Sequence, residues 1–246
     1  MLFVDIGNSW LKSAYYRDGV LHPINPVKTL TLMDEGNINW PLPDKNILAS
    51  EKIFVSSVAS EEVNQKCSKI LRSNLEIEPH FVKVQKTFNG MTTNYRLDRL
   101  GVDRWLACMA AWSKFKESLI VVDVGTAITV DFINKEGTHL GGLIAPGPKV
   151  LSIALSKKTA LLPSVSGHQK KFVIPTSTEE AIVCGLESLL LGFIHRVRFE
   201  SGQIYDSDPL WVLTGGASEI VSGSITWPHV IEPNLVLEGL KILAIG

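Results

Sequence analysis

The sequence lacks several motifs that identify common enzyme and cofactor classes. It contains no GxxxxGK[ST], which excludes a P-loop, and no two glycines are separated by one residue, which excludes the GxGxxG fingerprint of dinucleotide-binding folds. It also has no GxSxG nucleophile elbow and no HExxH zinc motif. If the protein binds a nucleotide, it must do so with a different kind of loop.

Cysteine is scarce as well. The three cysteines, Cys67, Cys108 and Cys184, are far apart, odd in number and never arranged as CxxC. This spacing supports neither a zinc ribbon nor a disulfide scaffold. We therefore expect buried, reduced thiols in a cytoplasmic protein.

An excess of charge and a long apolar segment are also missing. The chain has 24 Lys+Arg against 25 Asp+Glu, so no global positive field attracts nucleic acid or an anionic membrane. The longest apolar stretch, 119–133, is interrupted by Asp123 and Asp131 and is too short to span a bilayer. Asp5 interrupts the N-terminal apolar run where a signal peptide would need it unbroken. The sequence thus predicts a cytoplasmic protein that binds neither nucleic acid nor membrane.

An internal repeat is present in this chain of 246 residues. Residues 3–19, FVDIGNSWLKSAYYRDG, align without a gap with residues 121–137, VVDVGTAITVDFINKEG, so that Asp5 matches Asp123 and Gly7 matches Gly125. Each segment has an apolar strand, an Asp-x-Gly turn, a second apolar strand and a closing glycine, a pattern typical of a β-hairpin. The repeat indicates two similar halves that open with the same hairpin.

The remaining periodicity extends this pattern. Strands are expected at 53–58, 80–84, 138–144 and 210–213, and helices at 61–73, 100–115, 146–156, 178–199 and 234–245. Thr178 and Asn234 are the expected N-caps of the last two helices. Strands followed by helices, twice over, predict two α/β domains around mixed sheets, residues 1–117 and 118–246.

The Asp-Gly turns have the composition of phosphate-binding loops. A glycine lets backbone N–H groups approach an anion closely, and Asn8 and Ser9 add short donors. Lys12 supplies a cation that can meet a phosphate, while Asp5 can face a hydrated magnesium ion through water. A turn chosen only for its backbone conformation is the alternative for one such motif, and the second turn at Asp123 argues against it.

A third group of polar residues precedes the expected helix at 100–115. Gly101-Val102-Asp103-Arg104 puts a carboxylate beside a guanidinium at the helix start. Arg104 can grip a carboxylate in bidentate fashion, and Asp103 can accept a proton from a hydroxyl. Taken alone, these residues favour the plainer interpretation, an acidic first turn with a surface pair to Arg, over a substrate site.

Together these motifs resemble the type III pantothenate kinases of the actin, Hsp70 and sugar-kinase superfamily. The matching motifs occur in the family's order between residues 5 and 217: Asp5–Ser9, Gly101–Arg104, Asp123–Asp131, Gly141–Gly147 and Thr178–Ala181, with Gly215-Gly216-Ala217 as a weaker adenosine-side match. Ser9 stands where the family more often has Thr, which keeps the hydroxyl. Residues 21–49 show no family pattern.

The resemblance implies two actin-like, ribonuclease-H-like α/β domains with mixed sheets flanked by helices. It implies phosphorylation of pantothenate by ATP with Mg²⁺, the first step toward coenzyme A. Asp103 would be the catalytic base. The implied ATP-binding residues are Asp5, Ile6, Gly7, Asn8, Ser9, Trp10, Leu11, Lys12 and Thr126, with Thr129 a further candidate donor. The implied pantothenate-binding residues are Tyr95, Gly101, Val102, Asp103, Arg104 and Thr178.

The resemblance also implies a monovalent cation and a homodimer. Asp123 would help to hold potassium or ammonium beside the ATP phosphates, although the residues alone leave potassium and magnesium open. Thr178 would enter the pantothenate site of the partner protomer. The very apolar segment 186–194 fits either a dimer interface or a helix buried within one chain.

Two other functions compete with this interpretation. A nucleotide-binding accessory factor of transcription could keep the hairpins and lose Asp103 or Arg104, but both residues are present. Another small-molecule kinase of the same superfamily would usually have a longer chain with inserted lids.

Overall fold

The computed structural model describes residues 1–33, 40–44, 48, 52–159, 161–165, 167 and 174–246. These residues form two compact units, residues 1–115 with 234–246 (unit 1) and residues 116–233 (unit 2). The sequence-based division at 117/118 differs from this arrangement at the last helix, which belongs to unit 1. No helix among the described residues combines the length and apolarity needed to cross a lipid bilayer.

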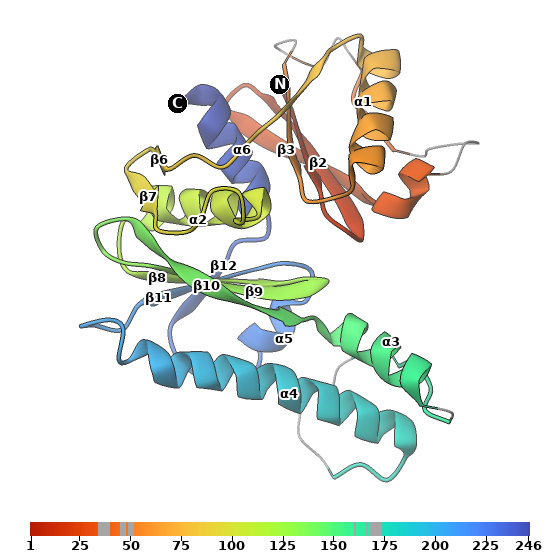
Figure 1. The fold of residues 1–246 in the computed structure, drawn as a ribbon, viewed down its shortest axis with the longest axis vertical. Helices are drawn as coiled ribbons and strands as arrows, with labels where there is room; N and C mark the ends of the chain where they lie inside the picture. Colours follow the sequence, from red (N-terminus) through yellow and green to blue (C-terminus); the bar gives the residue numbers. More distant parts are fainter. Residues whose placement is uncertain (34–39, 45–47, 49–51, 160, 166, 168–173) are drawn as a thin grey trace. The chain divides into compact units, whose positions relative to one another are not determined.

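Unit 1 is built on a mixed five-stranded sheet with the order β3-β2-β1-β4-β5 (Figure 1). Strand β1 pairs antiparallel with β2 and parallel with β4. The strands are β1 (Leu2–Ile6), β2 (Trp10–Arg17), β3 (Val20–Lys28), β4 (Ile53–Ser57) and β5 (Pro79–Phe81), and a short hairpin follows them, β6 (Thr87–Phe88) with β7 (Met91–Thr93).

Helices cover both faces of this sheet. Helix α1 (Glu61–Leu75) begins at the N-cap Ser60, whose side chain accepts from the N–H of Val63, and its apolar side packs on the face that carries Leu2, Val4 and Ile6. The other helices of the unit are η1 (Thr29–Met33), α2 (Val102–Phe115) and α6 (Leu235–Ile245).

Helix α6 packs against α2 and β1, which explains why it belongs to unit 1. A Cβ at Gly239 would lie 2.8 Å from the carbonyl carbon of Leu106 in α2, so only glycine permits this close approach. Asn234 precedes α6 as expected but makes no side-chain capping bond.

In unit 2 the strand order β10-β9-β8-β11-β12 repeats that of unit 1 strand for strand. Strand β8 pairs antiparallel with β9 and parallel with β11, as β1 does with β2 and β4. The strands are β8 (Leu119–Val124), β9 (Ala127–Ile133), β10 (Thr138–Pro146), β11 (Leu210–Thr214) and β12 (His229–Ile231). The predicted repeat and the mixed α/β class are therefore confirmed.

Unit 2 carries α3 (Pro148–Lys158), α4 (Thr178–Ser201) and α5 (Ser218–Ser222). Leu190, Ile194 and Val197 of α4 pack into the core formed by β8, β9 and β11. The expected N-cap of α4 was wrong by one residue. Ser177 is the cap, because its side chain accepts from the N–H of Glu180, and Thr178 is the first helical residue.

Several elements were not predicted from the sequence. These are β3, η1, the β6–β7 hairpin, α5 and β12, and the strand expected at 80–84 is β5 at Pro79–Phe81. The sequence did not predict β3, because Pro23 and Pro26 interrupt its apolar pattern. Proline is tolerated in this strand because β3 lies at the edge of the sheet. The three cysteines are buried thiols outside any disulfide, as expected, and burial raises the pKa of the Cys67 thiol to about 12.

Candidate functional site

The first Asp-Gly turn joins β1 to β2 and is tightly closed. The N–H of Gly7 donates to the carbonyl of Trp10 at 3.0 Å, and a Cβ at residue 7 would lie 3.1 Å from the same oxygen. Asn8 at the tip is exposed, and the indole of Trp10 is 45% exposed. The side chains of Ile6 and Leu11 are fully buried in the core, so they anchor the turn rather than present it.

Asp5 and Lys12 lie opposite each other in the β1–β2 ladder, so their side chains share one face of the sheet. Asp5 is buried and accepts a 3.0 Å hydrogen bond on Oδ1 from the hydroxyl of Ser56. Ser56 is fully buried on β4, directly beside Asp5 in the parallel pairing. This bond fixes one carboxylate oxygen of Asp5 and thereby the orientation of the other.

The Gly101–Arg104 motif forms the start of α2. The half-buried Asp103 accepts on Oδ1 from the N–H of Arg104 at 2.7 Å, and a Cβ at Gly101 would lie only 2.5 Å from that oxygen. Arg104 is buried, and its guanidinium lies 5.3 Å from the centre of the Tyr95 ring. Such stacking holds a guanidinium plane in a fixed orientation, which suits bidentate recognition of a carboxylate.

The two motifs of unit 1 meet at the carboxyl end of β4. The N–H of Val58 donates to the carbonyl of Ile6 at 3.2 Å, and Val58 Cγ1 would lie 3.7 Å from a Cβ at Gly101. Val58 therefore links the Asp5 turn to the start of α2. Ligands commonly bind at the carboxyl ends of parallel strands in open α/β sheets.

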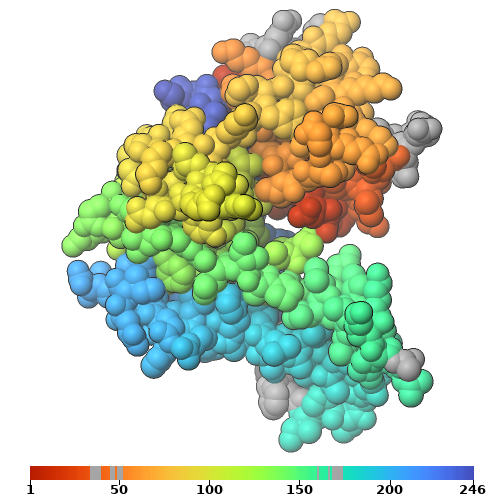
Figure 2. Space-filling model, viewed as in Figure 1, coloured from red at the N-terminus to blue at the C-terminus, as the bar shows by residue number. Residues whose placement is uncertain are grey.

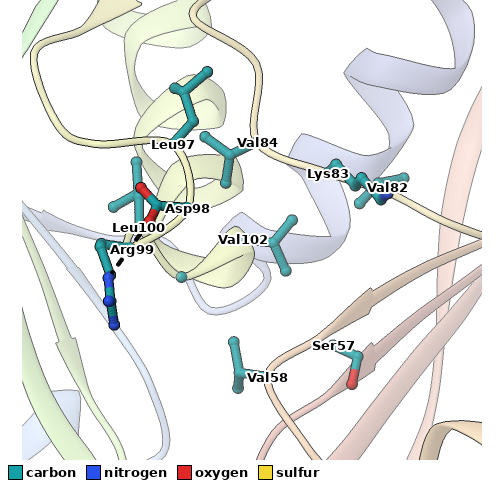
Figure 3. A pocket seen from close by; sticks show the side chains of 11 residues that line it. Ser57, Val58, Val82, Lys83, Val84, Leu97, Asp98, Arg99, Leu100 and Val102 are labelled. Carbon is teal, nitrogen blue, oxygen red and sulfur yellow. Dashed lines mark ion pairs between the residues drawn. The ribbon is translucent and has the colours of Figure 1, made fainter. Parts of the chain in front are cut away.

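An open groove of about 570 Å³ lies at this junction. Figure 3 shows Ser57 and Val58 at the end of β4, Val102 at the start of α2, and the segment 82–84 across from them. Asp98 and Arg99, on the loop before α2, also line the groove and form an ion pair at 3.5 Å. The groove thus offers both apolar walls and charged groups next to Gly101.

In unit 2, the second Asp-Gly turn joins β8 to β9, and two loops brace it. The N–H of Gly125 donates to the carbonyl of Ala127 at 3.0 Å, and the N–H of Gly147 donates to the carbonyl of Thr126 at 2.9 Å. A Cβ at Gly147 would lie 2.6 Å from the carbonyl oxygen of Thr126. The Gly141–Gly147 motif therefore ends against the turn, and the backbones are in direct contact.

The loop after β11 packs on the opposite side of this turn. Gly215 has a φ of +90°, and a Cβ there would overlap Oδ1 of Asp123 and lie 2.7 Å from the backbone nitrogen of Val124. The N–H of Ala217 donates to the carbonyl of Val124 at 3.0 Å. Gly215 thus borders the half-buried carboxylate of Asp123, whereas a Cβ at Gly216 would meet nothing within 4 Å.

Thr178 is exposed in the first turn of α4. The same helix has a stripe of exposed residues three or four positions apart, which we call the outer stripe: Ala181, Gly185, Ser188, Leu189, Gly192, His195, Arg196 and Phe199. Leu189 is 61% and Phe199 68% exposed, and the space beside Gly185 and Gly192 is open. Figure 2 shows α4 in cyan at the molecular surface. One side of this apolar helix is therefore not covered by the part of the chain that the structure describes.

Sequence reasoning missed three residues that shape these turns: Ser56, Thr29 and, as a neighbour of Asp123, Gly215. Ser56 and Thr29 stand in segments without a motif, each near a second hydroxyl residue (Ser57 and Thr31), and their roles depend on strand register. Gly215 was noted in the glycine pair after β11, but its contact with Asp123 required the structure.

Comparison with known proteins agrees with these motifs. The family model of type III pantothenate kinase matches residues 1–199. Type III pantothenate kinases from Hahella chejuensis (33% identity, covering 99% of this chain and 96% of that one) and Syntrophotalea carbinolica (37% identity, 78% and 75%) are similar along most of their length.

Solved structures show the same fold at low identity. One is a protein from Sinorhizobium meliloti described as a 2-dehydro-3-deoxygalactonokinase, with a TM-score of 0.60, 12% identity, and coverage of 99% of this chain and 97% of that one. Another is described as a Baf family transcriptional activator from Campylobacter jejuni, with a TM-score of 0.58, 22% identity, and coverage of 99% and 98%. The motifs in both units, the matching family model and the identities of 33% and 37% together show that this chain belongs to the type III pantothenate kinase family.

Proposed function

We propose that this chain transfers the γ-phosphoryl group of ATP to the primary hydroxyl of pantothenate, which gives 4'-phosphopantothenate for coenzyme A synthesis. The observation that carries the proposal is the junction in unit 1, where Val58 links the Asp5 turn to the start of α2 with Asp103 and Arg104. A phosphate-binding turn, a carboxylate and a guanidinium are then connected through Val58, which also lines the groove beside Gly101. Phosphoryl transfer needs mainly positioning and neutralisation of charge, which these groups supply.

The ATP phosphates are assigned to the turn from Asp5 to Lys12, and Thr126 stays a further proposed ATP-binding residue. Asn8 is exposed at the tip of the turn, and Lys12 lies beside Asp5 in the ladder, so a cation stands next to a carboxylate. Mg²⁺, when bound with ATP, neutralises the phosphate charge. Asp5, whose Oδ1 is held by the hydroxyl of Ser56, would face the hydration shell of this ion.

Pantothenate is assigned to the start of α2. Arg104, stacked on Tyr95, binds the pantothenate carboxylate. Asp103 accepts the hydroxyl proton as the hydroxyl oxygen bonds to the γ-phosphorus and the bond to the β-phosphate oxygen breaks, releasing ADP. Gly101 and Val102 line the groove and complete the acceptor site. Residue 101 has to be glycine, because a side chain there would displace the Asp103 carboxylate.

A panel of hydroxyl acceptors with ATP tests the function directly. Pantothenate is expected to be phosphorylated in preference to sugars, glycerol and acetate, because the site offers a buried guanidinium for a carboxylate that is remote from the reacting hydroxyl. Mass spectrometry of the product identifies the phosphorylated hydroxyl. Sugar phosphorylation in place of pantothenate would favour the related kinases, and ATP binding without any transfer would favour a regulatory protein.

A monovalent cation is proposed at Asp123. The residues fit such an ion, because the groups that could coordinate it are oxygens: the half-buried carboxylate of Asp123 and the backbone carbonyls of the turn. Gly147 and Gly215 pack so closely on this turn that a side chain at either position would overlap it. A hard cation prefers this kind of donor set. When bound beside ATP, potassium or ammonium would add positive charge next to the phosphates.

We expect activity to require potassium or ammonium in addition to magnesium. At fixed ionic strength, replacing potassium by sodium or Tris should strongly reduce the rate. Gly215→Ala should raise the potassium concentration for half-activation by about 10- to 100-fold, because its methyl group overlaps Oδ1 of Asp123. Gly216→Ala is the matched control, since its Cβ would meet nothing within 4 Å.

Equal rates with and without potassium would contradict this proposal, and so would a fully active Asp123→Ala variant. If Gly215→Ala and Gly216→Ala respond alike to potassium, the contact between Gly215 and Asp123 has no part in cation binding.

We also propose a homodimer in which the outer stripe of α4 packs against a second copy of the chain. Gly185 and Gly192 allow close approach of another helix, and the exposed Leu189 and Phe199 supply apolar surface. Thr178 on the same helix then enters the partner's pantothenate site. The three buried thiols fit a reducing compartment, so we place the enzyme in the cytoplasm, acting on small molecules rather than on nucleic acid or membrane.

A further inference from the structure

Thr29 lies outside the motifs described above, where β3 ends and η1 begins. Although the surrounding segment showed no family pattern, Thr29 is only 3% exposed. Its hydroxyl donates to the carbonyl of Gly7 at 2.7 Å, and its backbone N–H donates to the carbonyl of Ser9 at 3.0 Å. Thr29, the first residue after β3, therefore holds both neighbours of Asn8.

These two bonds are not part of the regular β2–β3 ladder. The last ladder pair is Trp10 with Lys28, so Thr29 is the first residue beyond it. The N–H of Gly7 is bound as well, to the carbonyl of Trp10 at 3.0 Å. The backbone on both sides of Asn8 is therefore held by hydrogen bonds to residues 10 and 29. The bond to the Gly7 carbonyl comes from the hydroxyl of Thr29, so it depends on this side chain and not on the backbone.

These hydrogen bonds are important for phosphate binding, because carbonyl oxygens that pointed at the phosphate would repel its oxygens. With the carbonyls of Gly7 and Ser9 bound to Thr29, the turn keeps one conformation before the anion arrives. Donors fixed in advance bind a charged group without the cost of reorganising the backbone. A loose turn would have to be ordered during each binding event.

We propose that Thr29 is a positioning residue for the triphosphate of ATP, acting through the Gly7-Asn8-Ser9 turn. The proposal rests on the proposed role of this turn in ATP binding. It concerns nucleotide affinity rather than the acceptor, since Thr29 bonds only to the turn among the contacts described above.

The test compares Thr29→Val, which keeps the shape but loses the hydroxyl, with Thr29→Ser, which keeps the hydroxyl. We expect Thr29→Val to weaken equilibrium binding of Mg-ATP, measured without acceptor, by about tenfold, because it leaves the Gly7 carbonyl without its donor. KM for ATP should rise in parallel while KM for pantothenate stays within about twofold, and Thr29→Ser should restore binding to within about twofold. Thr31→Val is the matched control. Thr31 lies in the same short helix as Thr29, and its hydroxyl also donates to a backbone carbonyl. That carbonyl belongs to Lys28 and not to the Gly7-Asn8-Ser9 turn.

The outcomes separate this inference from the proposed function. If the wild-type chain does not bind Mg-ATP, the role of the turn itself is wrong. If the wild type binds and Thr29→Val binds equally well, or no worse than Thr31→Val, Thr29 is not a positioning residue. An equal rise in the KM values for ATP and pantothenate would reveal general loosening and overturn the proposal. Should Thr29→Val fail to fold, Thr29→Cys, a weak donor, is compared with Thr29→Ser, and equal ATP affinity of these two variants would likewise overturn it.

Discussion

Replacing Asp103 by asparagine is expected to lower kcat by about 10²- to 10⁴-fold while ATP and pantothenate still bind. The amide keeps the shape of the carboxylate at the start of α2 and can still accept from the N–H of Arg104 through its oxygen. It cannot take the proton of the substrate hydroxyl. Steady-state kinetics, equilibrium binding of both substrates and circular dichroism together check this result.

Two variants make the Asp103 result specific. Asp18→Asn removes an exposed carboxylate from the turn between β2 and β3, where the residue has a φ of +52° that asparagine adopts readily, and should leave kcat unchanged. Arg104→Ala should chiefly raise KM for pantothenate, because it removes a binding group and not the base. Near-normal turnover of a folded Asp103→Asn variant would remove Asp103 from the role of base.

Two inactive variants are expected to restore activity to each other if the pantothenate site is shared across the dimer. Asp103→Asn chains are mixed with Thr178→Arg chains after dissociation, and the dimers are reassembled. Each heterodimer then contains one site with both substitutions and one with neither, so it should recover about half of the wild-type activity. In a random mixture about half of the dimers are heterodimers, and the total activity should return to about a quarter.

The matched control mixes Asp103→Asn chains with chains that carry both substitutions. Their heterodimers have no intact site, so no activity should return. Verified heterodimers of the two single variants that remain inactive would contradict the shared pocket. A monomer by light scattering at the assay concentration would contradict the dimer itself, and the outer stripe of α4 would then need another explanation.

The fold could largely be predicted from local sequence. The two hairpins were visible because strand, turn and strand are adjacent in the chain, and the repeated Asp-x-Gly pattern linked Asp5 to Asp123. Long periodic helices such as α1 and α2 were found to within two residues at each end. Short elements such as β12 and α5 were missed because three to five residues contain too little periodicity to identify them.

The candidate site, like the fold, was predicted from the sequence only in part. The sequence by itself determined which residues are proposed to carry chemistry, namely Asp5, Asp103, Arg104 and Asp123, because each stands in a motif of adjacent residues. It could not assign the last helix to unit 1, since the fit of Gly239 against Leu106 joins positions far apart in the chain.

Only the tertiary structure decided what holds these groups in place. Ser56 reaches Asp5 because β4 pairs in parallel with β1 at one register. Thr29 reaches Gly7 and Ser9 because it directly follows Lys28, the residue of the last β2–β3 ladder pair. A shift of one residue would turn either side chain to the other face of the sheet. Register is set by the packing of whole strands and not by the local sequence, so these supporting hydroxyls became recognisable only in the folded chain.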